Sequence, residues 1–452
     1  MQKRALAAPF ADNAEYLELA CARVRARIER AIAVAEGKPA EADKHAERAA
    51  ALAAEIAARV DGAEPKVRET LGLPSLQKRL GLDEADADVL MHAAAAQLDP
   101  SLAKLHTRLS GTAFHPWLDV GIAVQVQHDG VAERLRARAR FEPDAPLLRH
   151  RLIALDRARP EAKDNVNACE IKLPPRVARV VLGSDPTAGA ATYARLTTPT
   201  LALDSVVLPD DARAELEQVL AAQAGLGTRL REWGYDALLP SGRAVVVLFT
   251  GPPGTGKTML AHALAARLGK KLLAIDGPRL AEAGRALETE LDELFVEARL
   301  ADAVVLFDGC ESLFAGRGGA NARTAALMRA LDRFDGLVIL ATSTPERLDP
   351  TLDRRVLLRL PLEMPTGAMR EKIWRALLLP TVPLADDVDV NQLAKRYELS
   401  GGSIRSAVLY AVSKAVARGA DSTLTRADLD AAAQAQLRGD LNAWPSAPRT
   451  RA

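Results

Sequence analysis

A short glycine-rich segment near the middle of the chain constrains the fold more than any other feature of the sequence. It reads Gly251-Pro252-Pro253-Gly254-Thr255-Gly256-Lys257-Thr258 and fits the spacing G-x-x-x-x-G-K-[ST]. Five continuously apolar residues, 245–249, precede it, and a segment with leucines at 260, 264 and 268 follows it. Such apolar runs are typical of strands buried on both faces of a sheet. The order strand, loop, helix therefore predicts an α/β domain.

The loop is predicted to bind phosphate. Its glycines allow successive backbone N–H groups to point into one cavity, and the following helix adds the positive end of its dipole. We expect Lys257 to contact the β- and γ-phosphates of a nucleotide and Thr258 to offer its hydroxyl to Mg²⁺. The predicted ligands are thus the phosphates of a nucleotide together with Mg²⁺. The alternative, a glycine-rich turn that binds nothing, fits the flanking strand and helix less well.

Three more apolar runs alternate with helical segments, which predicts a parallel sheet with right-handed crossovers. They cover residues 271–275, 304–307 and 337–340. The second run ends in Asp308, so this strand should deliver a carboxylate to the carboxyl edge of the sheet, where ligands bind in such folds. We expect Asp308 to be the second magnesium ligand. Capping of the next helix is its simpler alternative role.

The remaining sequence indicates a mostly helical protein around this α/β core. We predict a helical hairpin at 1–70, a mostly helical, winged-helix-like domain at 71–190, the α/β domain at 201–365 and a helical end domain at 366–440. Short strands are expected within 147–155 and 169–173, and a linker at 184–200. Helices of the end domain are expected at 369–379, 389–398, 403–417 and 426–437.

Composition and charge limit the partners of the chain. Among 452 residues, 60 Lys and Arg nearly balance 59 Asp and Glu, so no basic excess favours nucleic acid. No apolar run approaches the roughly 18 residues that span a membrane, and the three cysteines form no metal motif. These features predict a cytoplasmic protein. Four arginines at 134, 136, 138 and 140 could contact nucleic acid, but without interleaved aromatic residues a solvated helix face is the simpler interpretation.

The phosphate loop and Asp308 belong to a longer ordered set of motifs. It continues with Ala341-Thr342-Ser343, Asp353-Arg354-Arg355 and Ser400-Gly401-Gly402-Ser403. The set, spread over about residues 201–437, resembles the AAA+ ATPases, specifically the AAA clade with a helical lid. Trp233-Gly234 with the segment before it, together with the residues Gly401 to Arg405, are also similar to bacterial AAA ATPases found with phage-tail-like contractile injection systems.

The resemblance implies a ring, usually a hexamer, with ATP between subunits and a protein complex as client. The ring would be homomeric or would include an active AAA+ subunit, and a contractile injection system component is one candidate client. The implied catalytic residues are Lys257, Asp308, Ser343 and the arginine-finger pair Arg354 and Arg355. The implied nucleotide contacts are the loop residues 251–258 with Met259, Val206, Val207, Gly402 and Ser403. Arg405 matches either a phosphate sensor or an ordinary surface arginine.

Three positions depart from this family pattern. Gly309 stands where a glutamate orients the attacking water, and Ser343 replaces an asparagine. The segment 280–285 lacks the aromatic residue that grips a threaded polypeptide. Glu311 could reach the water, although a first-turn helix acid is the simpler interpretation.

These departures leave three hypotheses. The chain is a remodelling or assembly ATPase with weakened chemistry, a nucleotide-binding scaffold without hydrolysis, or a DNA-linked AAA+ protein. The balanced charge disfavours the third. Restoring a carboxylate by Gly309→Glu is expected to raise hydrolysis if the rest of the site is intact.

Overall fold

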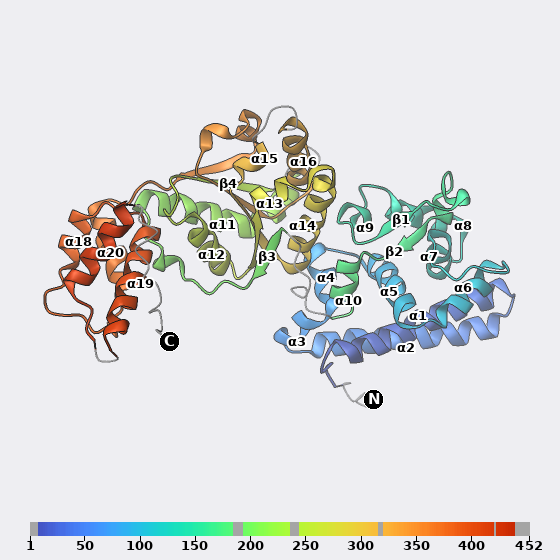
Figure 1. Ribbon diagram of the computed structural model, residues 1–452. Coiled ribbons are helices and arrows are strands. Elements are labelled where there is room, and N and C mark those ends of the chain that lie inside the picture. The colour runs from blue at the N-terminus through green and yellow to red at the C-terminus, as the bar shows by residue number, and fades with distance from the viewer. Residues whose placement is uncertain (1–7, 184–192, 236–243, 315–319, 420–421, 439–452) are drawn as a thin grey trace, which may run out of the picture. The chain divides into compact units, whose positions relative to one another are not determined.

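The computed structural model describes residues 8–183, 193–235, 244–314, 320–419 and 422–438 (Figure 1). The chain divides into two compact units, Met1–Gly189 and Ala190–Ala452. The finer boundaries expected at residues 70 and 365 stay predictions. No helix in these described ranges is long and apolar enough to cross a membrane.

The first unit is built around a long helical hairpin. Helix α1 (Asn13–Ala35) packs along α2 (Pro39–Gly62), which confirms two helices in this region, and α1 also packs on α5, α6 and α7. Asp12 and Asp83 cap α1 and α5 by accepting backbone N–H groups. The other helices are α3 (Pro65–Thr70), α4 (Gly72–Leu80), α5 (Glu84–Leu98), α6 (Leu102–Ser110), α7 (Val120–Gln127), α8 (Val131–Ala137), α9 (Pro146–Arg149) and α10 (Pro175–Val181).

A small antiparallel sheet completes the first unit. Strand β1 (Ala154–Asp156) pairs with β2 (Glu170–Lys172), with Leu155 opposite Ile171. The strand expected within 169–173 is confirmed. The one expected over 147–155 is mostly wrong, because Pro146 starts the short helix α9 and only the last residues of that stretch are extended.

The second unit contains a six-stranded sheet in the order β3-β5-β6-β7-β4-β8. Strand β3 runs antiparallel to β5, and the other neighbours are parallel. The four predicted strands are confirmed, and β3 and β8 were not expected. The strands are β3 (Ala194–Thr197), β4 (Val245–Thr250), β5 (Lys271–Asp276), β6 (Ala303–Asp308), β7 (Leu337–Thr342) and β8 (Val356–Pro361).

The linker expected at 184–200 is therefore wrong at its end, where β3 forms the sheet edge. Residues 184–192 of that linker lie outside the described residues. Both unexpected strands are edge strands with few buried side chains. Leu196 is the buried residue of β3 and Leu360 that of β8. Neither strand therefore shows the continuous apolar run of a central strand.

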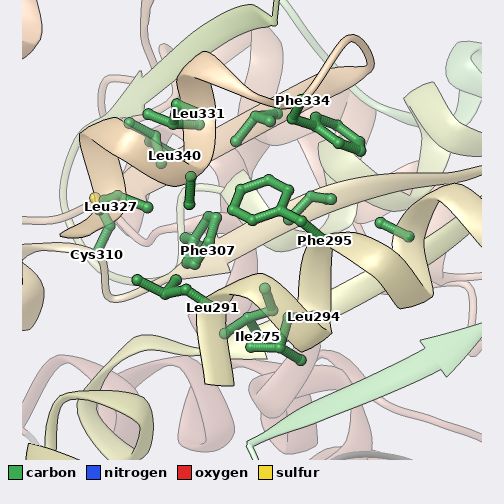
Figure 2. Close-up of a cluster of buried hydrophobic side chains, with 14 of the residues drawn as sticks. Ile275, Leu291, Leu294, Phe295, Phe307, Cys310, Leu327, Leu331, Phe334 and Leu340 are labelled. Atoms are coloured by element: carbon green, nitrogen blue, oxygen red, sulfur yellow. The ribbon is translucent and has the colours of Figure 1, made fainter. Parts of the chain in front are cut away.

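Alternate residues of a strand point to opposite faces of the sheet, and in the central strands both sets are apolar and buried. Helices therefore cover both faces. Helices α14 (Leu287–Ala301) and α16 (Ala320–Asp332) pack on one face, and α11 (Asp210–Glu232) and α12 (Lys257–Arg267) on the other. Figure 2 shows the first core, where the rings of Phe295 and Phe334 lie 4.9 Å apart between their centroids. Short helices α13 (Gly277–Ala281) and α15 (Glu311–Phe314) follow β5 and β6.

Four helices at the end of the described chain form their own core around Trp374. They are α17 (Gly367–Leu377), α18 (Val390–Arg396), α19 (Gly401–Arg418) and α20 (Arg426–Arg438). All four helices predicted here are confirmed within a few residues. Together with the parallel sheet and the helical first unit, they match the predicted fold class.

Candidate nucleotide-binding site

The glycine-rich loop follows β4 at the carboxyl edge of the sheet, where β4 lies between β7 and β8. Gly251, Gly254 and Gly256 have φ values of 138°, 80° and 102°, a region that other residues rarely adopt. A Cβ at Gly251 would lie 2.0 Å from the Leu362 carbonyl oxygen. Only glycine fits such a close approach, so the loop is held tightly against the chain that follows β8.

Helix α12 begins directly after the loop without a capping side chain. Its N-cap residue is Gly256, so the first N–H groups of the helix are available to an anion. Lys257 Nζ donates to the Gly251 and Pro252 carbonyl oxygens at 2.6 and 2.9 Å. Burial lowers the pKa of Lys257, and the carboxylates of Asp308 and Glu311 oppose that shift. The ammonium therefore lies over the loop, where phosphate oxygens would replace the carbonyl acceptors.

The two predicted magnesium ligands meet at this edge. Thr258 Oγ1, at the start of α12, donates to Asp308 Oδ2, at the end of β6, over 2.6 Å. A hydroxyl beside a carboxylate is an oxygen donor set that suits Mg²⁺. These residues therefore fit the predicted ion, which would neutralise charge on the β- and γ-phosphates when bound.

The helical end domain contacts the phosphate loop through the start of α19. The Gly402 N–H donates to the Gly254 carbonyl oxygen over 2.8 Å. Ser400 caps α19 by accepting from the Ser403 N–H at 3.2 Å, and a Cβ at Gly254 would lie 2.6 Å from Ser400 Oγ. The structure thus brings Gly402 and Ser403 to the loop. Ser400 belongs to the motif seen in the sequence but was not predicted to have a role of its own, although a serine before a helix is a common cap.

The other predicted nucleotide contacts differ in accessibility. Val206 is buried in the core that contains α12, and Val207 beside it is half-buried. Met259 is 42% exposed on α12. Thr255 Oγ1 donates to the Pro252 carbonyl oxygen over 2.9 Å, which stiffens the loop. Pro253 is exposed at the loop surface.

The predicted phosphate-sensing residues lie at different places. Ser343 directly follows β7 and is half-buried. Arg355 Nη2 forms an ion pair with Asp332 Oδ1 of the same chain at 2.6 Å. Arg354 is exposed, and in the described part of the chain no hydrogen bond or ion pair holds it. Arg405 is exposed on α19. Of the predicted arginine pair, Arg354 is thus the exposed member, whereas Arg355 is paired within the chain.

The chain turns sharply after Asp308. Gly309 has a φ of 66°, and a Cβ there would lie 3.0 Å from Pro278 Cδ. The Cys310 N–H donates to the Ala341 carbonyl oxygen over 3.0 Å, which ties this turn to the end of β7. A glutamate at 309 would adopt a strained left-handed backbone. The expectation that Gly309→Glu raises hydrolysis therefore needs revision.

The segment expected to form a pore loop lies after β5. Leu280 is buried in α13, and Gly284 to Ala286 form a short 3₁₀ helix. Glu282 and Arg285 are exposed, so charged rather than aromatic side chains face solvent here. This surface does not suit apolar gripping of an extended chain.

Comparisons with known proteins agree with this geometry. Residues 247–364 match the model of the "ATPase family associated with various cellular activities (AAA)", and residues 1–191 match "Winged helix domain, variant". Over 176 residues the chain is 35% identical to the Cell division cycle protein 48 homolog of Archaeoglobus fulgidus, covering 35% of this chain and 24% of that protein. Over 226 residues it is 34% identical to the ATP-dependent zinc metalloprotease FtsH 3 of Sphaerobacter thermophilus, covering 47% and 45%.

A solved chain from work on katanin self-assembly is also similar, with 24% identity and a TM-score of 0.43 over 53% of this chain and 87% of that one. Fold and site together define a P-loop module of α/β type with a helical lid. Residues 247–364 are similar to the AAA ATPase family, and the first 191 residues match a winged-helix region. Its matches span less than half the length of the two curated relatives.

Proposed function

We propose that this protein binds ATP with Mg²⁺ and couples that binding, with slow hydrolysis, to remodelling or assembly of a protein complex. The observation that carries this proposal is the Thr258–Asp308 hydrogen bond of 2.6 Å beside Lys257 at the uncapped start of α12. Together these groups supply a cation, free N–H donors and two hard oxygen ligands within one edge of the sheet. That combination suits a nucleoside triphosphate.

Each group has a distinct task in this proposal. The N–H groups of the loop and of α12 hold the phosphate oxygens, and Lys257 neutralises their charge. Thr258 and Asp308 hold Mg²⁺, which stabilises charge that develops on the transferred phosphate. Ser343 orients a phosphate oxygen or the water by hydrogen bonding.

The proposed assembly is a ring, hexameric in the family pattern, with Arg354 reaching the nucleotide of a neighbouring subunit. An arginine in that role stabilises the transition state and raises the rate of hydrolysis about 10³–10⁵-fold. Neighbours are copies of this chain or an active AAA+ subunit. The exposed position of Arg354 and the match of residues 247–364 to the AAA family support this arrangement.

The proposed client is a protein, with a component of a contractile injection system as one candidate, and the winged-helix region as the docking part. The lack of an aromatic residue in 280–285 favours assembly or conformational control over threading. The free thiols Cys21, Cys169 and Cys310 fit a reducing cytoplasm. Arg140 donates to Asp83 and Asp86 at 2.6 and 2.8 Å, so this arginine is already paired, which disfavours the DNA-linked alternative.

A second candidate function is a nucleotide-binding scaffold that does not hydrolyse ATP. One observation favours it: Gly309 offers no carboxylate, and its left-handed backbone would strain one. In that case bound ATP would hold the ring or a partner interface in one state.

Titration with a fluorescent ATP analogue, with and without Mg²⁺, tests the proposal. We expect Lys257→Ala to weaken binding about tenfold or more, because it removes charge-assisted hydrogen bonds to phosphate. Lys372→Ala, which removes an exposed lysine of α17, is the matched control and should bind like the parent. Mass photometry with and without ATP reports ring formation. Equal, negligible binding by the parent and Lys257→Ala would contradict the proposal.

A further inference from the structure

Glu311 carries a buried oxygen that nothing in the described part of the chain satisfies. It is the first residue of α15, three residues after Asp308. Its Oε2 atom is buried and has no hydrogen-bond partner among the described residues. A buried polar atom without a partner costs roughly 1–3 kcal/mol, and more when it is charged. Such an atom is compensated by a partner outside the described residues, and a water molecule or a ligand can supply it.

The surroundings of Glu311 place it at the phosphate edge of the sheet. The hydrogen bond from the Cys310 N–H to the Ala341 carbonyl oxygen, 3.0 Å long, sets the start of α15 beside the end of β7. Thr344 Oγ1, just beyond that strand, is also buried without a partner among the described residues. The negative charge of the Glu311 carboxylate raises the pKa of Lys257, as that of Asp308 does. Two unsatisfied oxygens therefore belong to residues that follow the carboxyl ends of β6 and β7, the edge where ligands bind in such folds.

We propose that Glu311 is the carboxylate that orients and deprotonates the attacking water, in place of the one missing at Gly309. This inference rests on the proposed ATP-binding function and deepens it. Gly309 forms the turn after β6, and Glu311 begins α15 two residues later. Glu311 therefore differs from the missing glutamate in its position in the sequence, but it follows the same edge of the sheet.

The simpler role of Glu311, as an acid in the first turn of a helix, does not account for the structure. Helix α15 has four residues, so its dipole is short. An acid that interacts only with the helix dipole is more stable with its carboxylate oxygens in water, because burial of an unpaired charge costs free energy. Glu311 instead holds one oxygen out of solvent and without a donor among the described residues.

With Glu311 in this role, hydrolysis is a single displacement at the γ-phosphorus. The water oxygen forms a bond to the γ-phosphorus while one water proton passes to the Glu311 carboxylate. The bond from the γ-phosphorus to the bridging oxygen breaks, and its electron pair stays with the β-phosphate of ADP. The proton then leaves Glu311 for the released phosphate or for solvent. Lys257 and the N–H groups of α12 hold the phosphates in place throughout.

Substitution of this carboxylate tests the inference. Glu311→Gln keeps the size and removes the base, so kcat should fall about 100-fold or more while the ATP dissociation constant changes by less than about twofold. Protein recovered after incubation with ATP should hold ATP in the variant and ADP in the parent. Glu346→Gln removes an exposed acid after the neighbouring strand β7 and is the matched control. Glu311→Asp should retain part of the activity.

The outcomes separate this inference from the proposed function. If Glu311→Gln binds ATP and hydrolyses it within about twofold of the parent, the assignment of Glu311 is wrong. If the parent binds ATP with Mg²⁺ but releases no phosphate, the assignment also fails, while nucleotide binding stands. Absence of ATP binding by the parent would instead overturn the proposed function itself. Equal thermal midpoints of the variant and parent establish that the variant is folded.

Discussion

Gly277 and Gly309 lie against each other, such that a Cβ at Gly277 would be 2.6 Å from the Gly309 carbonyl oxygen. The first residue opens α13 after β5, and the second forms the turn after β6. Any larger residue at 277 would push this turn away. Gly309 is therefore one part of a close backbone contact in which both neighbouring strand ends use glycine.

We predict that Gly309→Glu does not restore fast hydrolysis. The left-handed φ of 66° and the 3.0 Å approach to Pro278 Cδ strain any side chain there. The strain should destabilise the fold by about 1–2 kcal/mol, and phosphate release should stay within about twofold of the parent. Thermal unfolding and a phosphate-release assay measure the two effects.

A matched control for this variant is Gly269→Glu. Gly269 has the same φ of 66° and follows α12, and a Cβ there would meet no described atom within 4 Å. Its substitution should carry the backbone strain without the crowding. A tenfold or greater rise in phosphate release by Gly309→Glu would contradict the prediction, and would show that the turn adapts to a carboxylate.

Features of the fold that depend on neighbouring residues could be predicted from the sequence, whereas features that depend on distant contacts could not. The strands 245–250, 271–276, 303–308 and 337–342 were predictable because central strands read as continuous apolar runs. The phosphate loop was predictable because its function depends on a short contiguous spacing. Edge strands β3 and β8 bury too few side chains to give that signal. The roles of Ser400 and Gly277 were not predicted, because they depend on contacts with residues distant in sequence.

We predict that Thr258→Ala weakens nucleotide binding only when magnesium is present. The variant removes the hydroxyl that donates to Asp308 Oδ2 at 2.6 Å and that is expected to bind the ion. Loss of one such ligand should reduce affinity for Mg²⁺-ATP about tenfold. Titrations with Mg²⁺ and with EDTA measure this difference. An equal loss in both conditions would show that Thr258 acts on the phosphates or on folding instead.

We predict that Asp428→Asn destabilises the helical end domain. Asp428 is buried and accepts from Arg418 Nη1 and Nη2 at 2.6 and 2.7 Å and from Thr425 Oγ1 at 2.7 Å. The Arg418 guanidinium holds the pKa of Asp428 below its usual range. Since Arg418 is half exposed, solvent screens the pair, and the loss should be about 1–3 kcal/mol.

Chemical denaturation at neutral pH measures this loss, with Asp386→Asn, an exposed acid, as control. Because the folded pKa of Asp428 is depressed, its stabilisation is present above the unfolded value near 3.8 and declines as pH falls through and below it. The difference between parent and variant should therefore shrink in acid. A constant difference from neutral to strongly acidic pH would contradict the role of the ionised carboxylate.

The first unit contains a pair of buried histidines on neighbouring helices. His92 Nε2 lies 2.9 Å from His106 Nε2, and His106 Nδ1 lies 3.3 Å from the Pro116 carbonyl oxygen. Since a carbonyl only accepts, Nδ1 of His106 carries the proton, and His92 donates to His106 Nε2 in the neutral pair. Burial lowers the pKa of both rings, and the charge of Arg27 lowers that of His92 further.

Other groups near His106 act in opposite directions. The charge of His115 lowers its pKa, whereas the carboxylate of Asp119 and the hydrogen bond to Pro116 raise it. Burial is the largest effect, so the folded pair resists protonation. In the unfolded chain, histidines take up protons near pH 6.5.

We therefore predict that the first unit loses stability as the pH falls below about 6.5, because the unfolded chain then binds protons that the folded pair does not. The slope should reach at most about 1.4 kcal/mol per pH unit for each histidine. Hydrogen exchange of peptides from α5 and α6, followed in the full chain from pH 7 to pH 5 and corrected for the intrinsic rate, measures it. His92→Gln should flatten this dependence, whereas His128→Gln should not. Unchanged protection across that range in the parent would show that the pair stays neutral in both states or protonates without cost.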